Sequence, residues 1–182
     1  MRVLSESLMG AKLLELVPRH DERGFFARAF CRDTLAGLGI DAVVAQANMS
    51  HSRCRGTLRG LHYQLEPSAE TKLVMCILGA VHDVVLDLRS ASPTFGRWIG
   101  VELSAENRRV MVVPPGCAHG FLTMSDDASV FYLVSSNYDP ERERGVRFDD
   151  PTFAVGWPFA PTVVSDRDRH HPSFDPGWHL AA

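Results

Sequence analysis

Short apolar runs separated by glycine and proline constrain this chain more than any other feature of its sequence. Eleven prolines and fourteen glycines fall between these runs. Glycine and proline at such short intervals are typical of a chain with many short strands and leave little room for long helices. Val81–Arg89 shows the pattern most clearly, because apolar residues there alternate with Asp83, Asp87 and Arg89, as they do on the two faces of a strand.

Two neighbouring strands are predicted to form a hairpin. Lys72–Leu78 is almost continuously apolar, and Gly79 with Ala80 offers a turn before Val81–Arg89. Other apolar segments bounded by Gly, Pro, Asn or Asp predict further strands at Trp98–Leu103, Arg109–Val113, Gly120–Met124 and Val130–Ser135. Their spacing of roughly ten residues is typical of a β-sandwich or barrel. We therefore expect an all-β fold.

One short helix is predicted at Asp33–Leu38, with Asp33 or Thr34 capping its start and Gly37 or Gly39 its end. The residues from Pro158 onward are proline-rich and polar, with one short helical turn expected near the end. A chain of 182 residues suits one domain, so we expect residues 1–182 to form a single domain.

Charge and cysteine usage exclude several classes of protein. The net charge of -3 gives no basic excess of the kind that nucleic-acid-binding proteins carry, so no nucleic-acid partner is expected. Polar residues interrupt the N-terminal segment too often for a signal peptide, and no apolar run is long enough to span a membrane. The cysteines are widely separated, without a C-x-x-C pair, which favours reduced thiols in a cytoplasmic protein: Cys31, Cys54, Cys76 and Cys117.

A histidine motif points to a particular kind of barrel. The P-x-G-x-x-H pattern that ends at His119 resembles the second short motif of cupins, which are small double-sheet barrels. Metal-binding cupins have an H-x-H pair in their first motif, whereas this chain has His62-Tyr63-Gln64. Because glutamine replaces the second histidine, the sequence argues against a bound metal. A structural histidine that closes a turn is the alternative for His119.

Eight short motifs follow one another along the chain: Arg23-Gly24-Phe25-Phe26, Gln46-x-Asn48-x-Ser50, Leu58-Arg59-Gly60-Leu61-His62, Lys72-Leu73-Val74, Ser92-Pro93-Thr94-Phe95-Gly96, Leu103-Ser104-x-Glu106-Asn107, Pro115-Gly116-x-x-His119-Gly120-Phe121 and Trp157-Pro158. Over roughly residues 13–172 their order resembles the dTDP-4-dehydrorhamnose 3,5-epimerase family. The resemblance implies a cupin-type jelly-roll β-barrel with a few short helices, a homodimer, and neither metal nor other cofactor. It also implies epimerisation of a nucleotide-linked 4-keto-6-deoxy sugar.

The resemblance assigns catalytic roles to four residues. Removing a proton from C3 or C5, beside the 4-keto group, leaves an enolate, and returning the proton from the opposite face inverts the carbon. The implied base is His62, and its partner is Asp168 in a C-terminal extension, residues 159–182, with Asp166 as the alternative. Tyr132 is the implied acid on the opposite face, and Lys72 the cation that stabilises the enolate. Without the resemblance, Tyr132 would be interpreted as core packing and Lys72 as a solvated lysine.

Substrate binding is expected to depend on arginines, because a guanidinium group matches phosphate oxygens well. Together with the residues that the resemblance adds, the expected set is Arg23, Arg28, Gln46, Asn48, Arg59, His119, Glu143 and Arg167. Arg28 replaces a glutamate usual in the family, Ala47 replaces an aspartate, and Glu70 stands where many members have glutamine. The preferred nucleotide base therefore stays open.

Three alternative functions remain open from the sequence. A related enzyme could invert C3 or C5 alone with the same base and acid. A non-catalytic cupin could hold a sugar nucleotide with the same charged residues. A metal-dependent cupin dioxygenase or isomerase is the third alternative, which the glutamine at position 64 argues against.

Overall fold

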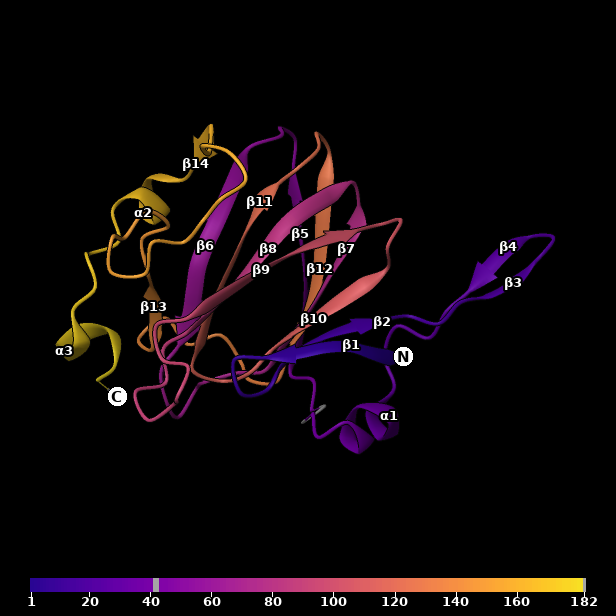
Figure 1. The fold of residues 1–182 in the computed structure, drawn as a ribbon, viewed down its shortest axis with the longest axis horizontal. Coiled ribbons are helices and arrows are strands. Elements are labelled where there is room, and N and C mark those ends of the chain that lie inside the picture. The colour runs from indigo at the N-terminus through magenta and orange to yellow at the C-terminus, as the bar shows by residue number, and fades with distance from the viewer. Residues whose placement is uncertain (41–42, 182) are drawn as a thin grey trace.

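Two β-sheets packed face to face form the body of the computed structural model, which describes residues 1–40 and 43–181 (Figure 1). In spatial order, the first sheet consists of β1 (Arg2–Ser7), β2 (Ala11–Glu15), β10 (Arg109–Val113), β7 (Lys72–Leu78), β12 (Ala128–Val134) and β5 (Gln46–Ser52). The second consists of β13 (Glu143–Gly145), β6 (Thr57–Gln64), β11 (Cys117–Thr123), β8 (Ala80–Asp87) and β9 (Trp98–Ser104), with β14 (Val163–Val164) beside β6. The predicted all-β architecture is therefore confirmed.

The predicted hairpin between Lys72–Leu78 and Val81–Arg89 is wrong. Both segments are strands, but β7 pairs with β10 and β12, whereas β8 pairs with β9 and β11 in the other sheet. Gly79, at φ +69°, turns the chain from one sheet to the other. A tight turn between two apolar strands looks the same in a sequence whether it joins neighbours in one sheet or crosses between two sheets.

Three short helices occur in the described part of the chain: α1 (Arg32–Gly37), α2 (Asp166–Arg169) and α3 (Pro176–His179). The predicted helix is present as α1, but its N-cap is Cys31, so capping by Asp33 or Thr34 is wrong. Cys31 makes no side-chain capping bond, and Leu35 is buried, which indicates that packing rather than capping sets the start of α1. No described helix is long and apolar enough to cross a membrane.

The main core lies between the sheets, and part of each outer face is also covered. The residues between the sheets include Val74, Val85, Met111, Phe121 and Val130. Helix α1 adds Leu35 to an apolar cluster on the first sheet, and the chain after β12 covers the second sheet with residues that include Val146 and Phe153. Because both faces of β7 are covered from Lys72 to Cys76, its continuous apolar run is stable there.

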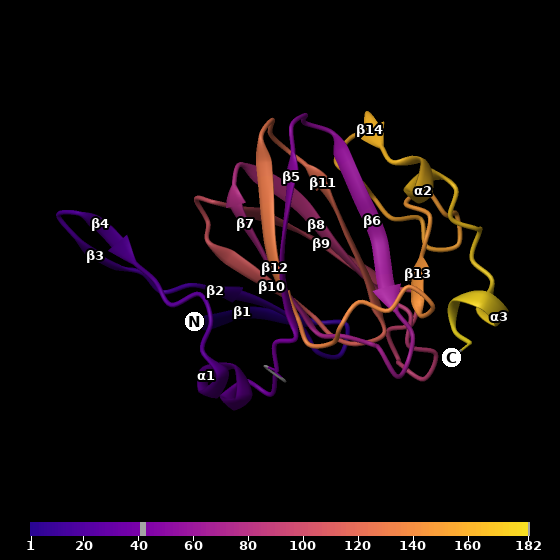
Figure 2. The ribbon, with the colours of Figure 1, turned by 180° about the vertical axis from the view of Figure 1, so that it is seen from behind.

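Two segments lie at opposite ends of the molecule (Figures 1 and 2). The hairpin of β3 (Arg19–Asp21) and β4 (Gly24–Phe26) projects away from the barrel, and its Phe25 and Phe26 are 54% and 65% exposed. At the other end, the C-terminal segment runs beside β6 and carries α2 and α3. These two segments matter for the site.

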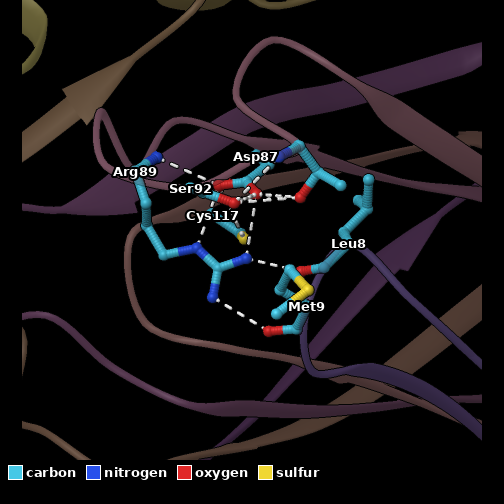
Figure 3. Close-up of polar contacts among 7 residues, drawn as sticks. Leu8, Met9, Asp87, Arg89, Ser92 and Cys117 are labelled. Carbon is cyan, nitrogen blue, oxygen red and sulfur yellow. Dashed lines mark hydrogen bonds and ion pairs between the residues drawn. The ribbon is translucent and has the colours of Figure 1, made fainter.

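The end of β8 is joined to the turn between β1 and β2 by a buried ionic cluster (Figure 3). The fully buried carboxylate of Asp87 accepts hydrogen bonds from Arg89, Ser92 and Thr94. Arg89 also donates to the carbonyl oxygens of Leu8 and Met9. The Ser92–Gly96 motif is thereby explained by structure, since its hydroxyl groups hold Asp87.

Candidate active site

A cavity of about 550 Å³ opens between the two sheets and collects most of the predicted site residues. Its lining includes Arg59, His62, Lys72, His119, Tyr132, Glu143, Arg167 and Asp168. A second cavity of about 280 Å³ is lined by Gln46 and Asn48 and shares His62, Lys72 and Tyr132 with the first. The two cavities therefore adjoin and together hold ten of the twelve predicted residues.

Strand periodicity explains how the two sheets present these side chains to one space. Val74 of β7 and Val130 of β12 face the main core, and Lys72 and Tyr132 lie two positions away from them on the same faces. On the opposite sheet, His62 of β6 and His119 of β11 are cross-strand neighbours. Two histidines thus face a lysine and a tyrosine across the cavity.

The C-terminal segment brings Asp168 to His62. Strand β14 pairs with the start of β6, and α2 follows at once, with Ser165 Oγ accepting from the Asp168 backbone N–H at 3.1 Å. The carboxylate of Asp168 then accepts from the Gly60 N–H at 3.3 Å and lies 2.7 Å from His62 Nε2. Gly60 has φ +108°, and a Cβ there would lie 2.7 Å from the His119 carbonyl oxygen, so glycine is required at this position.

This contact sets the tautomer of His62. A carboxylate only accepts hydrogen bonds, so Nε2 carries the proton and Nδ1 is left as the basic nitrogen. Burial acts to raise the pKa of Asp168, but the imidazoles of His171 and His62 outweigh it and hold that pKa well below its usual range. Asp168 is therefore ionised and favours the positive charge that His62 gains when it takes up a proton. Asp166, the alternative partner, is exposed and does not line either cavity.

His119 has a buried partner that sequence reasoning did not identify. Its Nε2 lies 2.7 Å from Asp83 Oδ2, and Asp83 is fully buried between the sheets. A signal was present, since Asp83 is a charged residue within the apolar strand Val81–Arg89 and a buried carboxylate needs a partner. The pair fixes the ring of His119 in the cavity wall.

Lys72 is held in place by Glu70, another residue that was noted only as a departure from the family. Lys72 Nζ lies 3.1 Å from Glu70 Oε1 and donates to the carbonyl oxygen of His62 at 3.2 Å. Both side chains are about nine-tenths buried. The amide of Gln64 donates to Glu70, Ser68 and Asn137, so Gln64 supports this loop.

The hydroxyl group of Tyr132 keeps its proton over a wide pH range. Burial raises the pKa of Tyr132, the carboxylates of Glu70 and Glu143 raise it further, and Arg59 opposes them. A neutral phenol beside a lysine is suited to donate a proton.

The mouth of the cavity carries the remaining charges. Arg59 donates to Ser52 Oγ and to the His51 carbonyl oxygen, which leaves its guanidinium at the cavity wall. Arg167 of α2 forms an ion pair with Glu143, which also accepts a hydrogen bond from Tyr138 at 2.6 Å. Burial raises the pKa of Glu143, but its bonds with Arg167 and Tyr138 lower it overall. Glu143 is thus an ionised anchor for Arg167.

Arg23 and Arg28 line neither cavity within one chain. Arg23 sits at the tip of the projecting hairpin, paired with Asp21, and Arg28 is exposed just after β4. Ala47 is exposed between Gln46 and Asn48, on the face of β5 turned away from the second cavity. A single chain therefore does not bring Arg23 or Arg28, both predicted to bind substrate, to either cavity.

His171 is a further residue near the site that the sequence analysis did not single out. Its Nε2 lies 3.5 Å from Asp168 Oδ1, and its side chain is 9% exposed. Its position three residues after Asp168 was the only signal in the sequence.

Comparison with known families supports one kind of function. The sequence model of the dTDP-4-dehydrorhamnose 3,5-epimerase family matches residues 5–176. A curated dTDP-4-dehydrorhamnose 3,5-epimerase from Shigella flexneri is 41% identical over 175 residues, which is 96% of each chain. A dTDP-4-dehydrorhamnose 3-epimerase from Streptomyces niveus is 42% identical over 158 residues, covering 85% of this chain and 76% of its own length.

The fold is also similar to solved structures of this family. The crystal structure of a dTDP-4-dehydrorhamnose 3,5-epimerase from Bacillus anthracis, with TDP and PPi bound, superposes with a TM-score of 0.93 at 41% identity. The match covers 95% of this chain and 99% of that chain. The expected cupin-type fold class is confirmed by this similarity together with the two packed sheets.

Proposed function

Because the chain belongs to the dTDP-4-dehydrorhamnose 3,5-epimerase family, we propose that its cavity inverts C3 and C5 of a dTDP-linked 4-keto-6-deoxy sugar. The product would be dTDP-4-dehydro-L-rhamnose. The observation that carries the proposal is the His62–Asp168 contact at 2.7 Å, in a cavity whose opposite wall holds Lys72 and Tyr132.

The first step is removal of a proton from the carbon beside the ketone. His62 Nδ1 takes the proton, and the ionised Asp168 stabilises the resulting imidazolium. The electron pair of the C–H bond moves onto the ketone oxygen as an enolate. The ammonium of Lys72, buried and fixed by Glu70, stabilises that oxygen. Each of these roles is filled by a group of this chain, so this step needs no cofactor.

The second step returns a proton to the other face of the sugar. Tyr132 comes from the sheet opposite His62, so its hydroxyl group can protonate the enolate carbon from the far side. Inversion follows because removal and return occur on opposite faces. His62 then releases its proton to solvent and Tyr132 takes one up from solvent, after which the same base and acid act on the second carbon.

Binding of the nucleotide part would use the charged mouth of the cavity. Arg59 and Arg167 would contact the pyrophosphate, because guanidinium groups bind phosphate oxygens through paired hydrogen bonds. Glu143 would position Arg167, and His119 would contact the sugar with its ring held by Asp83. Gln46 and Asn48 would contact substrate in the adjoining cavity.

We infer that the working enzyme is a cytoplasmic homodimer in which residues 1–182 act as one domain. The projecting hairpin exposes two phenylalanines, an arrangement that is typical of a surface covered by another chain. A second copy is the natural occupant, because Arg23 and Arg28 could reach a substrate only in a partner's cavity. Four cysteines without disulfides are consistent with the cytoplasm.

The test is to incubate the enzyme with dTDP-4-keto-6-deoxyglucose in deuterated water and locate the label by NMR. We expect deuterium at both C3 and C5. Label at C3 alone would identify the activity of the Streptomyces niveus relative, and binding without any label would identify a non-catalytic binding protein.

A further inference from the structure

His171 approaches the catalytic pair from a side that the proposed reaction does not use. Its ring meets the ring of His62 edge to face, with centroids 5.7 Å apart. It does not line either cavity, whereas His62 and Asp168 do. His171 therefore stands behind Asp168 rather than beside the substrate.

The backbone opposite His62 leaves room for this ring. Gly145 of β13 is the cross-strand neighbour of His62, and a Cβ there would lie 2.1 Å from His171 Cε1 and Nε2. Any other residue at position 145 would displace the imidazole. Gly145 thus allows His171 to be buried and directed toward Asp168.

The buried Nε2 of His171 makes only a long contact, with Asp168. Among the described residues, Nε2 is one of the few buried side-chain atoms that make no hydrogen bond of normal geometry, with Asp168 Oδ1 3.5 Å away. A buried imidazole nitrogen in that state loses the hydrogen bonds that water would provide. A metal ion that binds this nitrogen in place of a proton would compensate for that loss.

Three potential ligand atoms converge here. Within the described chain, one atom each from His62, Asp168 and His171 lie within 4.8 Å of one another. Zinc binds imidazole nitrogen and carboxylate oxygen at about 2.0–2.2 Å, so neighbouring ligand atoms in a tetrahedral site lie about 3.3 Å apart. Asp168 Oδ1 lies 2.7 Å from His62 Nε2 and 3.5 Å from His171 Nε2, one distance below that value and one above it.

We propose that His62, Asp168 and His171 form a binding site for a divalent transition-metal ion, Zn²⁺ in particular, which inhibits the enzyme. Two nitrogen ligands and one carboxylate suit zinc, whereas Mg²⁺ prefers oxygen ligands. The fourth position would be filled by water.

The metal would act on the base and leave the cavity open. Zinc on Nε2 of His62 requires the ring's proton to sit on Nδ1, so that nitrogen can no longer accept a proton from the sugar. Because the ion would lie behind the cavity wall, kcat should fall while KM changes little. This inhibition depends on the role proposed for His62, but metal binding itself does not.

Binding is tested by calorimetric titration of ZnCl₂ into full-length protein stripped with EDTA and dialysed. We expect one high-affinity ion per chain, and a Kd at least tenfold weaker for His171→Ala. His170→Ala is the matched control, because that neighbouring histidine is exposed and should leave zinc binding unchanged. Equal zinc binding by wild type and His171→Ala would overturn the site.

Inhibition is tested by adding ZnCl₂ to the deuterium-exchange assay, with each variant normalised to its own zinc-free rate. We expect loss of exchange in wild type, recovery with EDTA, no effect of MgCl₂, and a midpoint at least tenfold higher for His171→Ala. Zinc binding that requires His171 but leaves exchange unchanged would overturn the inhibition and contradict the proposed role of His62. Absence of exchange before zinc is added would instead count against the proposed function alone.

Discussion

At the scale of single residues, the site depends on partners that hold each reactive group. His62, His119 and Lys72 each contact a buried carboxylate, from Asp168, Asp83 and Glu70 respectively. A buried carboxylate fixes the orientation of the ring or ammonium that it contacts. The site is thus built from paired groups rather than from isolated histidines and lysines.

Glu70→Gln tests one of these partners. The carboxylate of Glu70 helps to raise the pKa of Tyr132, so a neutral glutamine lowers that pKa and the phenol loses its proton at a lower pH. The alkaline limb of the kcat–pH profile should therefore move to lower pH, as measured by steady-state kinetics. Glu66→Gln is the control, because Glu66 is exposed on the same loop. An alkaline limb that stays in place would contradict a role for Glu70 in setting this pKa.

The sequence could supply the reactive residues but only some of their partners. Asp168 was predicted through a motif of the family, whereas Asp83 and His171 lie in none of the motifs that carry the resemblance. Partners need to be close in space but not in sequence, so a local motif need not contain both. Strand pairing, for example, brings Asp83 to His119 although they are 36 positions apart in the chain.

At the scale of strands and turns, the two sheets are tied together by charged groups at their ends. Several bonds lower the pKa of Asp87 to about 2 against the effect of its burial. The bonds come from Arg89, Ser92 and Thr94, and Arg89 extends the cluster to the turn between β1 and β2. This cluster fixes the exit of β8 (Figure 3).

Asp87→Asn should lower the free energy of unfolding by about 2–4 kcal/mol, because it leaves Arg89 without its charged partner in a buried site. Urea denaturation measures the loss. The pKa of Asp87 is 3.8 in the unfolded chain and about 2 in the folded protein. Its carboxylate therefore stabilises the fold above pH 3.8, and this stabilisation is lost as the pH falls toward about 2.

As the pH falls from 3.8 to about 2, the free energy of unfolding of wild type should therefore decrease by about 2 kcal/mol more than that of Asp87→Asn. Asp149→Asn, at an exposed ion pair with Arg147, should behave as wild type. The same acid-induced loss in Asp87→Asn and wild type would rule out this source of stability.

Strand positions could be read from periodicity, but strand partners could not. Lys72–Leu78 and Arg109–Val113 agree with the predicted segments residue for residue. Which strands pair with each other depends on how the rest of the chain packs against both faces of each sheet. That is why β7 and β8 were both predicted while their pairing was wrong.

At the scale of the whole molecule, the projecting hairpin is the feature that one chain does not explain. Phe25 and Phe26 are both more than half exposed, and Arg23 and Arg28 lie away from the cavities. A second copy that covers the hairpin would account for both observations. Sequence patterns describe neighbours within a chain, so periodicity could not reveal this surface.

Replacing both phenylalanines by serine should shift the protein from dimer to monomer, because the interface loses two large apolar side chains. Light scattering after size-exclusion chromatography measures the mass. The double variant should also lose at least about tenfold in kcat/KM if Arg23 reaches a partner's substrate.

The control for this variant is Met9→Ser, since Met9 is 63% exposed in the turn between β1 and β2. That variant should keep the mass and activity of wild type. A wild-type protein that is monomeric and fully active would contradict the proposed role of the hairpin.

The catalytic role of His62 is tested most directly by solvent exchange at C3 and C5 in His62→Ala. If His62 is the base for both carbons, the rate of deuterium incorporation should fall at least about 10³-fold at each, within the range for loss of a general base. Circular dichroism would establish that the variant keeps its fold. Exchange at the wild-type rate at either carbon would show that another group removes that proton.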